Sequence, residues 1–86
     1  RVVIEFDSIE APYIRGRQWH HSQVLEDKPD GTLRMTITVG GLGEVMRWVM
    51  SLGSHAWVVE PEELRERTAG EIERVQRRYS GHTPVQ

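Results

Sequence analysis

The chain has 86 residues, 37% hydrophobic and 28% charged, which is typical of one globular domain rather than of a disordered or fibrous chain. Its net charge of −2 argues against a protein that binds nucleic acid mainly by long-range attraction, and the absence of cysteine excludes disulfides, thiolate nucleophiles and cysteine zinc sites. No apolar run approaches the roughly 18 residues that a membrane span needs, and no signal-peptide pattern opens the chain, so a cytoplasmic location is expected.

A strand followed by a short helix is expected at the start of the chain. Apolar residues recur with a period of two over 2–6, which predicts a strand with one buried face. The residues expected on that face are Val2, Ile4 and Phe6. Ser8 is a good N-cap, so a short helix is predicted over 9–15 and is expected to stop at Gly16.

The next segment predicts a β-hairpin. The run over 17–26 is extended in character, and the Lys-Pro-Asp-Gly sequence at 28–31 is a strong turn signal. The second arm, 32–39, alternates strictly between apolar and polar residues, as a strand with one buried face does. Its apolar face holds Leu33, Met35, Ile37 and Val39, and its polar face holds Thr32, Arg34, Thr36 and Thr38.

Two further helices and a short strand are expected in the second half. Glycines at 40, 41 and 43 end the hairpin, after which apolar residues recur at helical spacing up to Gly53. The segment 55–59 is a short β-rich run, and a last helix is predicted to begin at Pro61. Its expected buried stripe is Leu64, Thr68, Ile72, Val75 and Tyr79. A loose tail is expected over 80–86, which leaves one domain over 1–79.

This order of elements predicts an α+β fold, a ferredoxin-like βαββαβ sandwich with a four-stranded antiparallel sheet and an additional C-terminal helix. Helices are expected on one sheet face only, so the other face is open for a partner or ligand. The core under the helices is predicted to contain Leu33, Met35, Ile37, Val39, Val45, Val49, Leu64 and Ile72.

Neither catalysis nor metal binding is indicated by the residues. On a strand, the neighbours His20 and His21 point to opposite faces and cannot chelate one ion together, and the other two histidines lack a ligand at i+2 or i+4. No Gly-x-Ser-x-Gly elbow surrounds Ser8 or Ser22. We therefore expect no enzyme, no metal and no cofactor.

Three arginines, Arg15, Arg17 and Arg34, are candidates for a small anion-binding patch. The arginines of the last helix have acidic residues three or four positions away, whereas these three lack adjacent acids and flank the extended run around Trp19. Plain exposure to solvent explains them equally well.

Two tryptophans are candidate interface residues. If Ala56 faces the helices, Trp57 projects onto the open sheet face beside Thr36 and Thr38, where an exposed tryptophan resembles an interface anchor. In the opposite phase Trp57 lies in the core, and so short a strand is compatible with both. Trp48 lies off the apolar stripe of its helix, so we expect it to cover the helix edge or to contact a neighbouring domain.

Several stretches, taken together, carry a family resemblance. They are Arg17-Gln18-Trp19-His20-His21-Ser22-Gln23, Asp30-Gly31, the segment 42–53 with Trp48, Glu60-Pro61-Glu62-Glu63-Leu64-Arg65, and Tyr79. Over nearly the whole chain they resemble the C-terminal extension of WYL-domain transcriptional regulators, called the WCX domain. The most specific elements are the Trp-His-x-Ser-Gln and Glu-Pro-x-x-Leu-Arg sequences.

The resemblance implies a bacterial regulator in which a winged helix-turn-helix binds promoter DNA, a WYL domain senses a ligand, and this domain comes last. It further implies single-stranded nucleic acid or another anionic effector, and a homodimer that the extension helps to assemble. The chain contains neither of the other two domains, so we expect no promoter binding by it alone, and Arg1 in place of Met fits a piece of a longer protein. The alternatives are a free-standing ferredoxin-like domain that binds a small molecule and, less favoured, a small enzyme.

Overall fold

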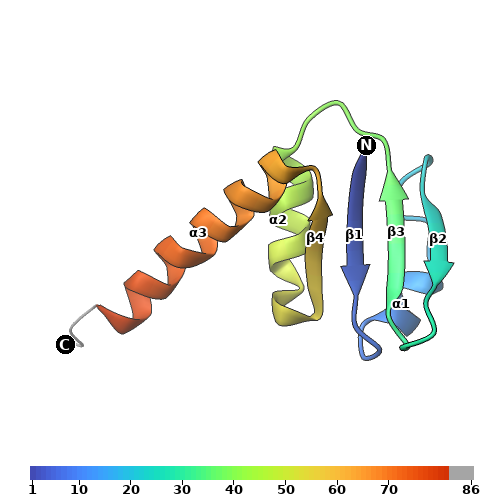
Figure 1. Cartoon of the computed structure of the whole chain (residues 1–86), viewed down its shortest axis with the longest axis horizontal. Coiled ribbons are helices and arrows are strands. Elements are labelled where there is room, and N and C mark those ends of the chain that lie inside the picture. The colour runs from blue at the N-terminus through green and yellow to red at the C-terminus, as the bar shows by residue number, and fades with distance from the viewer. Residues whose placement is uncertain (82–86) are drawn as a thin grey trace.

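The computed structural model describes residues 1–81 and contains one four-stranded antiparallel sheet in the order β2-β3-β1-β4 (Figure 1). The strands are β1 (Val2–Phe6), β2 (Val24–Asp27), β3 (Leu33–Ile37) and β4 (Ala56–Glu60). The helices are α1 (Ala11–Arg15), α2 (Gly43–Ser51) and α3 (Glu62–Ser80), with a single 3-10 turn, η1 (Gly53–His55), before β4. The α+β class, the four-stranded antiparallel sheet and the additional C-terminal helix are confirmed.

The hydrophobic core lies between the sheet and the helices. Alternating residues of β1 and β3 meet side chains from all three helices on one sheet face. The largest buried side chains there are Ile4, Phe6, Ile14, Leu33, Met35, Val49 and Leu64. The predicted core is thus confirmed for Leu33, Met35, Ile37, Val45, Val49 and Leu64. Val39 follows the end of β3 and is only half-buried against this core, and the prediction is wrong for Ile72, which is exposed.

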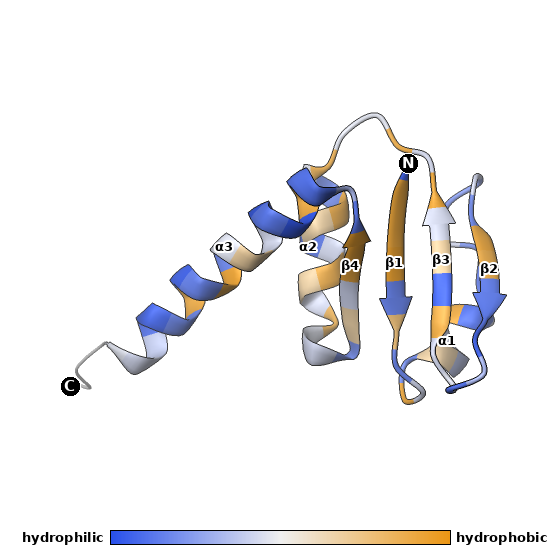
Figure 2. Cartoon of the chain, in the orientation of Figure 1, coloured by the Kyte–Doolittle hydropathy of each residue, from blue (hydrophilic) through white to orange (hydrophobic). Residues whose placement is uncertain are grey.

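Ile72 is exposed because α3 is longer than the sheet that it packs against. A helix of 19 residues is about 28 Å long, whereas a five-residue strand spans about 17 Å. The first turns of α3 bury Leu64 and Thr68 against the body of the domain, and the rest of the helix projects away from it (Figures 1 and 2). Three apolar residues of the expected stripe, Ile72, Val75 and Tyr79, therefore lie in the open.

The last helix continues one residue beyond its expected end. α3 continues to Ser80, so the first residue assigned to the expected tail belongs to the helix. Of the rest of that predicted tail, Gly81 caps the helix and 82–86 lie outside the described residues, so the boundary of the domain stays a prediction.

β1, one of the two central strands, is buried on both faces, whereas the sequence pattern predicted one buried face. It is hydrogen-bonded to β3 on one side and to β4 on the other. Val3 lies between Thr36 and Glu60 of these neighbours, and Glu5 is covered by two basic side chains described below. Neighbouring strands and long polar side chains thus remove from solvent a face that no helix covers.

The hairpin is confirmed, with a shorter first arm. β2 and β3 pair from Val24 opposite Thr36 to Asp27 opposite Leu33, and Gly31 has φ +91°, a left-handed conformation that favours glycine. Residues 17–23 were predicted as part of the first arm, but they form a loop.

Asp7 links the end of β1 to the start of β4. Its Oδ1 accepts hydrogen bonds from the backbone N–H of Ile9 (3.1 Å) and Glu10 (2.9 Å), so Asp7 rather than the predicted Ser8 binds the free amides ahead of α1. Its Oδ2 lies 2.7 Å from Nδ1 of His55. The pair therefore connects two strand ends that are 48 residues apart in sequence.

The Asp7–His55 contact predicts how stability depends on pH. The hydrogen bond to Asp7, together with its charge, raises the pKa of His55 above 6.5, and the same bond with the Glu10 amide lowers the pKa of Asp7 below 3.8. The contribution of His55 to the free energy of unfolding is fully present below the pKa of the unfolded chain and is lost as the pH rises through the pKa of the folded chain. The contribution of Asp7 to the free energy of unfolding is present above the pKa of the unfolded chain and is lost as the pH falls through the pKa of the folded chain.

We therefore expect the free energy of unfolding, measured by urea denaturation, to fall as the pH rises from about 6 to about 8, and His55→Gln to reduce this fall. His21→Gln, at an exposed histidine, is the matched control and should keep the wild-type profile. Parallel pH profiles for the wild type and His55→Gln would show that the Asp7–His55 pair does not contribute to the pH dependence of stability.

Candidate functional site

The sheet face opposite the helices carries Arg34, Thr36 and Trp57 of the side chains predicted for it. Ala56 and Val58 of β4 are buried in the core, whereas Trp57 is 39% exposed. Trp57 pairs with Glu5 of β1, which in turn pairs with Arg34 of β3, so all three side chains lie in one row across the sheet. The phase that the sequence left open is therefore the one in which Trp57 projects from the open face.

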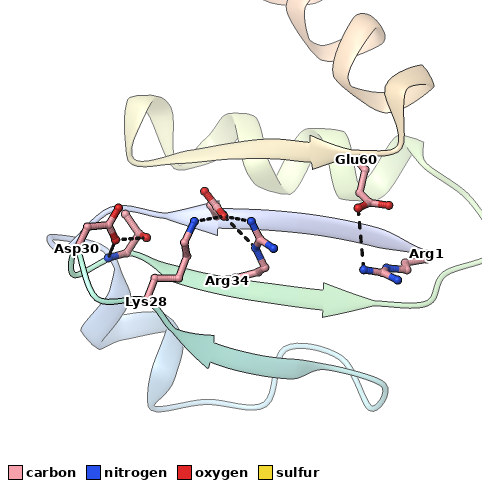
Figure 3. A network of polar contacts seen from close by, with 7 residues as sticks. Arg1, Lys28, Asp30, Arg34 and Glu60 are labelled. Carbon is pink, nitrogen blue, oxygen red and sulfur yellow. Dashed lines mark hydrogen bonds and ion pairs between the residues drawn. The ribbon is translucent and has the colours of Figure 1, made fainter.

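Glu5 is the centre of this open face. Its Oε2 accepts hydrogen bonds from Lys28 Nζ at 2.9 Å and from Arg34 Nε and Nη2 at 2.9 and 2.6 Å (Figure 3). The Glu5 side chain is only 9% exposed. Desolvation by burial acts to raise the pKa of Glu5, but the hydrogen bonds and charges of Lys28 and Arg34 outweigh it, so the pKa lies below 4.5. Glu5 therefore stays ionised and holds both basic residues on the sheet.

The two predicted threonines differ in their surroundings. Thr36 is half-buried on β3, opposite Val3 of β1 and Val24 of β2. Thr38 is exposed just after β3, and its backbone N–H donates to Ser22 Oγ at 2.9 Å. Thr36 therefore belongs to the open face, while Thr38 is tied to the loop before β2.

The three arginines proposed for an anion-binding patch do not come together. Arg34 is held by Glu5 on the open face, and Arg15 forms an ion pair with Asp27 at 2.5 Å. Both thus have an acidic partner, which corrects the expectation that they lack one. Arg17 lies over the ring of Trp19, 4.9 Å from its centroid. A role in effector binding stays a prediction for these residues.

Trp19 and Trp48 extend the core instead of forming separate surface features. Their ring centroids are 5.2 Å apart, and Trp48 also makes an edge-to-face contact with Phe6 at 5.8 Å. Trp19 Nε1 donates to the backbone oxygen of Ile14 at 3.0 Å, which ties the loop after α1 to that helix. Trp48 therefore covers its helix edge, and its contact with another domain stays a prediction.

A groove opens beside these tryptophans, on the side of the sheet that carries the helices. Its volume is about 670 Å³. Its lining includes Trp19, His20 and His21 of the loop before β2, the glycines at 40, 41 and 43, and Trp48 of α2. A Cβ added to any of these three glycines would meet no atom within 4 Å, so no other part of the domain packs closely against them there. Nothing in the sequence pattern predicted this groove.

The Trp-His-x-Ser-Gln stretch shapes the groove by holding its own loop. Gln23 Oε1 accepts hydrogen bonds from the backbone N–H of Trp19 (2.6 Å) and His20 (3.1 Å), while its Nε2 donates to the Arg17 backbone oxygen at 3.1 Å. His20 Nδ1 lies 2.7 Å from Ser22 Oγ. This stretch was the sequence signal that could have revealed the groove, because its polar side chains form hydrogen bonds with the backbone of a loop, which a strand would not need.

The histidines at 20 and 21 are arranged differently from the prediction. They lie in this loop, not on a strand, and their rings stack at 4.4 Å instead of pointing to opposite faces. Within residues 1–81 there is no cluster of three or more histidine, aspartate or glutamate side chains suited to holding a metal ion. No helix in that same part of the chain has the length and apolar character to cross a membrane.

Comparison with known proteins gives one family. The model of the WCX domain matches residues 1–76, a span that includes the whole sheet, α1, α2 and most of α3. The WCX domain is the C-terminal domain of WYL-domain regulators and represents a regulatory rather than an enzyme family. No curated protein matches the chain.

Proposed function

Because the chain belongs to the WCX domain family, we propose that it is the C-terminal regulatory domain of a bacterial WYL-domain transcriptional regulator. In this role it helps to assemble the regulator dimer and transmits effector binding to an N-terminal winged helix-turn-helix. The family match over residues 1–76 carries the proposal. The strand and helix order supports the finer assignment of the domain to the ferredoxin-like fold.

The surface of the domain supports a role in protein contacts. Trp57 is partly exposed on the open sheet face beside Glu5, and large aromatic side chains in such positions are typical anchors of interfaces. The net charge of −2 does not favour tight binding to promoter DNA by this domain. The alternative, a free-standing domain that binds a small molecule, would require a ligand that stabilises the isolated chain.

The sequence encoded upstream of Arg1 tests this proposal directly. We expect a WYL domain next to the present domain and a winged helix-turn-helix before it. A catalytic domain or an unrelated fold in that position would contradict the proposal.

Arg17 is the residue through which we propose that the domain contacts an anionic effector. Its guanidinium lies over Trp19, one of the residues that line the groove beside Trp48, whereas Arg15 and Arg34 are engaged by Asp27 and Glu5. A cation beside an exposed aromatic ring suits a single-stranded nucleic acid, whose bases stack and whose phosphates are anionic.

Reversal of this charge gives a test in the whole regulator. We expect Arg17→Glu to weaken binding of a fluorescently labelled single-stranded oligonucleotide and to flatten the dependence of its affinity on salt, because one phosphate contact is lost. Arg67→Glu, the same charge change on α3, is the control. Equal affinities for both variants would place the effector contacts outside the Arg17 region.

A further inference from the structure

The exposed half of α3 presents an apolar stripe that the domain itself does not cover. Ile72, Val75 and Tyr79 are spaced by three and four residues, which places them on one side of the helix. Their side chains are 52%, 38% and 84% exposed, respectively. The stripe continues the line of the buried Leu64 and Thr68, so the same face of the helix is covered near β4 and open beyond it.

A groove between α2, β4 and α3 adjoins this stripe. Its volume is about 310 Å³, and its lining includes Met50, Trp57, Thr68, Ala69 and Ile72. Ile72 belongs to both the stripe and the groove, so the two form one continuous surface that reaches from the end of α3 to Trp57. Its apolar residues are accompanied along the groove by the charged Glu62, Arg65 and Glu66.

We propose that this surface binds a second copy of the chain, with two α3 helices packed antiparallel and Tyr79 of each copy inserted into the groove of the other. The proposal deepens the dimer-assembly role proposed above and rests on it for the choice of partner. Such an interface is self-complementary, as a twofold dimer requires.

The spacing of the stripe supports the antiparallel arrangement. If Ile72 of one copy faces Val75 of the other, the twofold axis passes between these positions and Tyr79 lies opposite Thr68 of the second copy. Thr68 lines the groove, so Tyr79 of each copy lies beside the groove of the other. A parallel pair would place the two Tyr79 side chains against each other and leave both grooves empty.

The charges beside the stripe complement each other in the same arrangement. Glu71 and Arg78 precede Ile72 and Tyr79 by one residue each, so both lie along the same edge of the stripe. In an antiparallel pair, this edge of one helix runs beside the same edge of the other helix in the opposite direction. Glu71 of each copy therefore lies opposite Arg78 of the other. Arg74, which pairs with Glu71 at 2.8 Å within the chain, helps to orient this carboxylate.

Sedimentation of the 86-residue chain tests the interface. We expect a concentration-dependent dimer between about 10 µM and about 1 mM, and its loss in Val75→Asp, which places a charge in the centre of the stripe without touching the core. Circular dichroism checks that this variant keeps its helix content. A wild-type chain that stays monomeric throughout the range overturns the interface, while the proposed function is judged separately by the upstream sequence.

A charge exchange tests the register. We expect Arg78→Glu and Glu71→Arg each to weaken the dimer by at least about threefold, and the double variant to restore it, because each single change places like charges opposite each other. Arg77→Glu is the matched control, since it makes the same charge change one residue away on the opposite side of α3. Equal effects of Arg77→Glu and Arg78→Glu would overturn the proposed register.

Cross-linking tests the direction, because the chain has no cysteine of its own. An equimolar mixture of Ile72→Cys and Val75→Cys chains should form a mixed disulfide on oxidation. Tyr79→Cys alone should not form one, since antiparallel helices hold the two positions roughly 16 Å apart along the axis. Rapid disulfide formation by Tyr79→Cys would show a parallel pair and overturn the proposal.

Discussion

Replacement of Ile37 by alanine is expected to lower the free energy of unfolding by roughly 2 to 5 kcal/mol. Ile37 is 4% exposed and lies at the end of β3 in the cluster that joins the sheet to the helices. The substitution removes three buried carbon atoms and leaves a cavity that close-packed neighbours fill only in part. A domain of this size is expected to have a total stability of about 4 to 13 kcal/mol, so the loss is a large part of it.

Chemical denaturation of the wild type and of two alanine variants provides the measurement. Ile9→Ala is the matched control, because it makes the same chemical change at a side chain that is 64% exposed, and it should stay within about 0.5 kcal/mol of the wild type. If Ile37→Ala melts like Ile9→Ala, Ile37 does not lie in the core.

The second large effect is expected on the open sheet face, where Glu5→Gln should destabilise the domain by about 1 to 3 kcal/mol at neutral pH. Glutamine has nearly the same shape but no charge, so Lys28 and Arg34 lose the anion that all three of their hydrogen bonds reach. Both basic side chains are about one-third exposed, which lets water compensate in part and keeps the expected loss below that of a fully buried pair.

The same substitution has a distinct pH signature. Because the pKa of Glu5 is lower in the folded chain, its stabilising effect is present above the unfolded value of about 4.5 and is lost as the pH falls through the folded value. The difference between the wild type and Glu5→Gln should therefore shrink in acid.

Glu26→Gln is the matched control for this prediction. Glu26 is an exposed acid on β2, directly opposite Arg34 in the pairing of β2 with β3. We expect it to change stability by no more than about 0.5 kcal/mol. A Glu5→Gln variant as stable as Glu26→Gln at neutral pH would show that the network does not hold the sheet face together.

Local sequence patterns were sufficient for the elements whose environment repeats along the chain. The alternation of Leu33, Met35 and Ile37 with polar residues specified both the strand β3 and its buried face, because a period of two is a property of the strand itself. The apolar spacing over 42–53 predicted α2 for the same reason, with Val45 and Val49 buried as expected. The family resemblance also depended on short stretches that the chain presents directly.

Residues 17–23 show where local patterns were insufficient. An extended composition does not reveal that the amide of Gln23 satisfies three backbone groups of its own loop, and these hydrogen bonds replace strand pairing. The aromatic groove was missed with them, because Trp19 and Trp48 are 29 positions apart and meet only in the folded chain.

The sequence by itself determined the number of strands and helices and the residues that β3 and α2 bury, since these follow from short-range periodicity. Only the tertiary structure decided the exposed phase of Trp57, the burial of Glu5 by Arg34 and the exposure of Ile72. Each of these depends on a neighbouring part of the fold. Pairing with β1 selects the phase of β4, and Arg34, which is 29 positions away in sequence, neutralises Glu5. The sheet is too short to cover the second half of α3. A periodic pattern states that a helix has an apolar face, whereas the dimensions of the neighbouring layer determine how much of that face is buried.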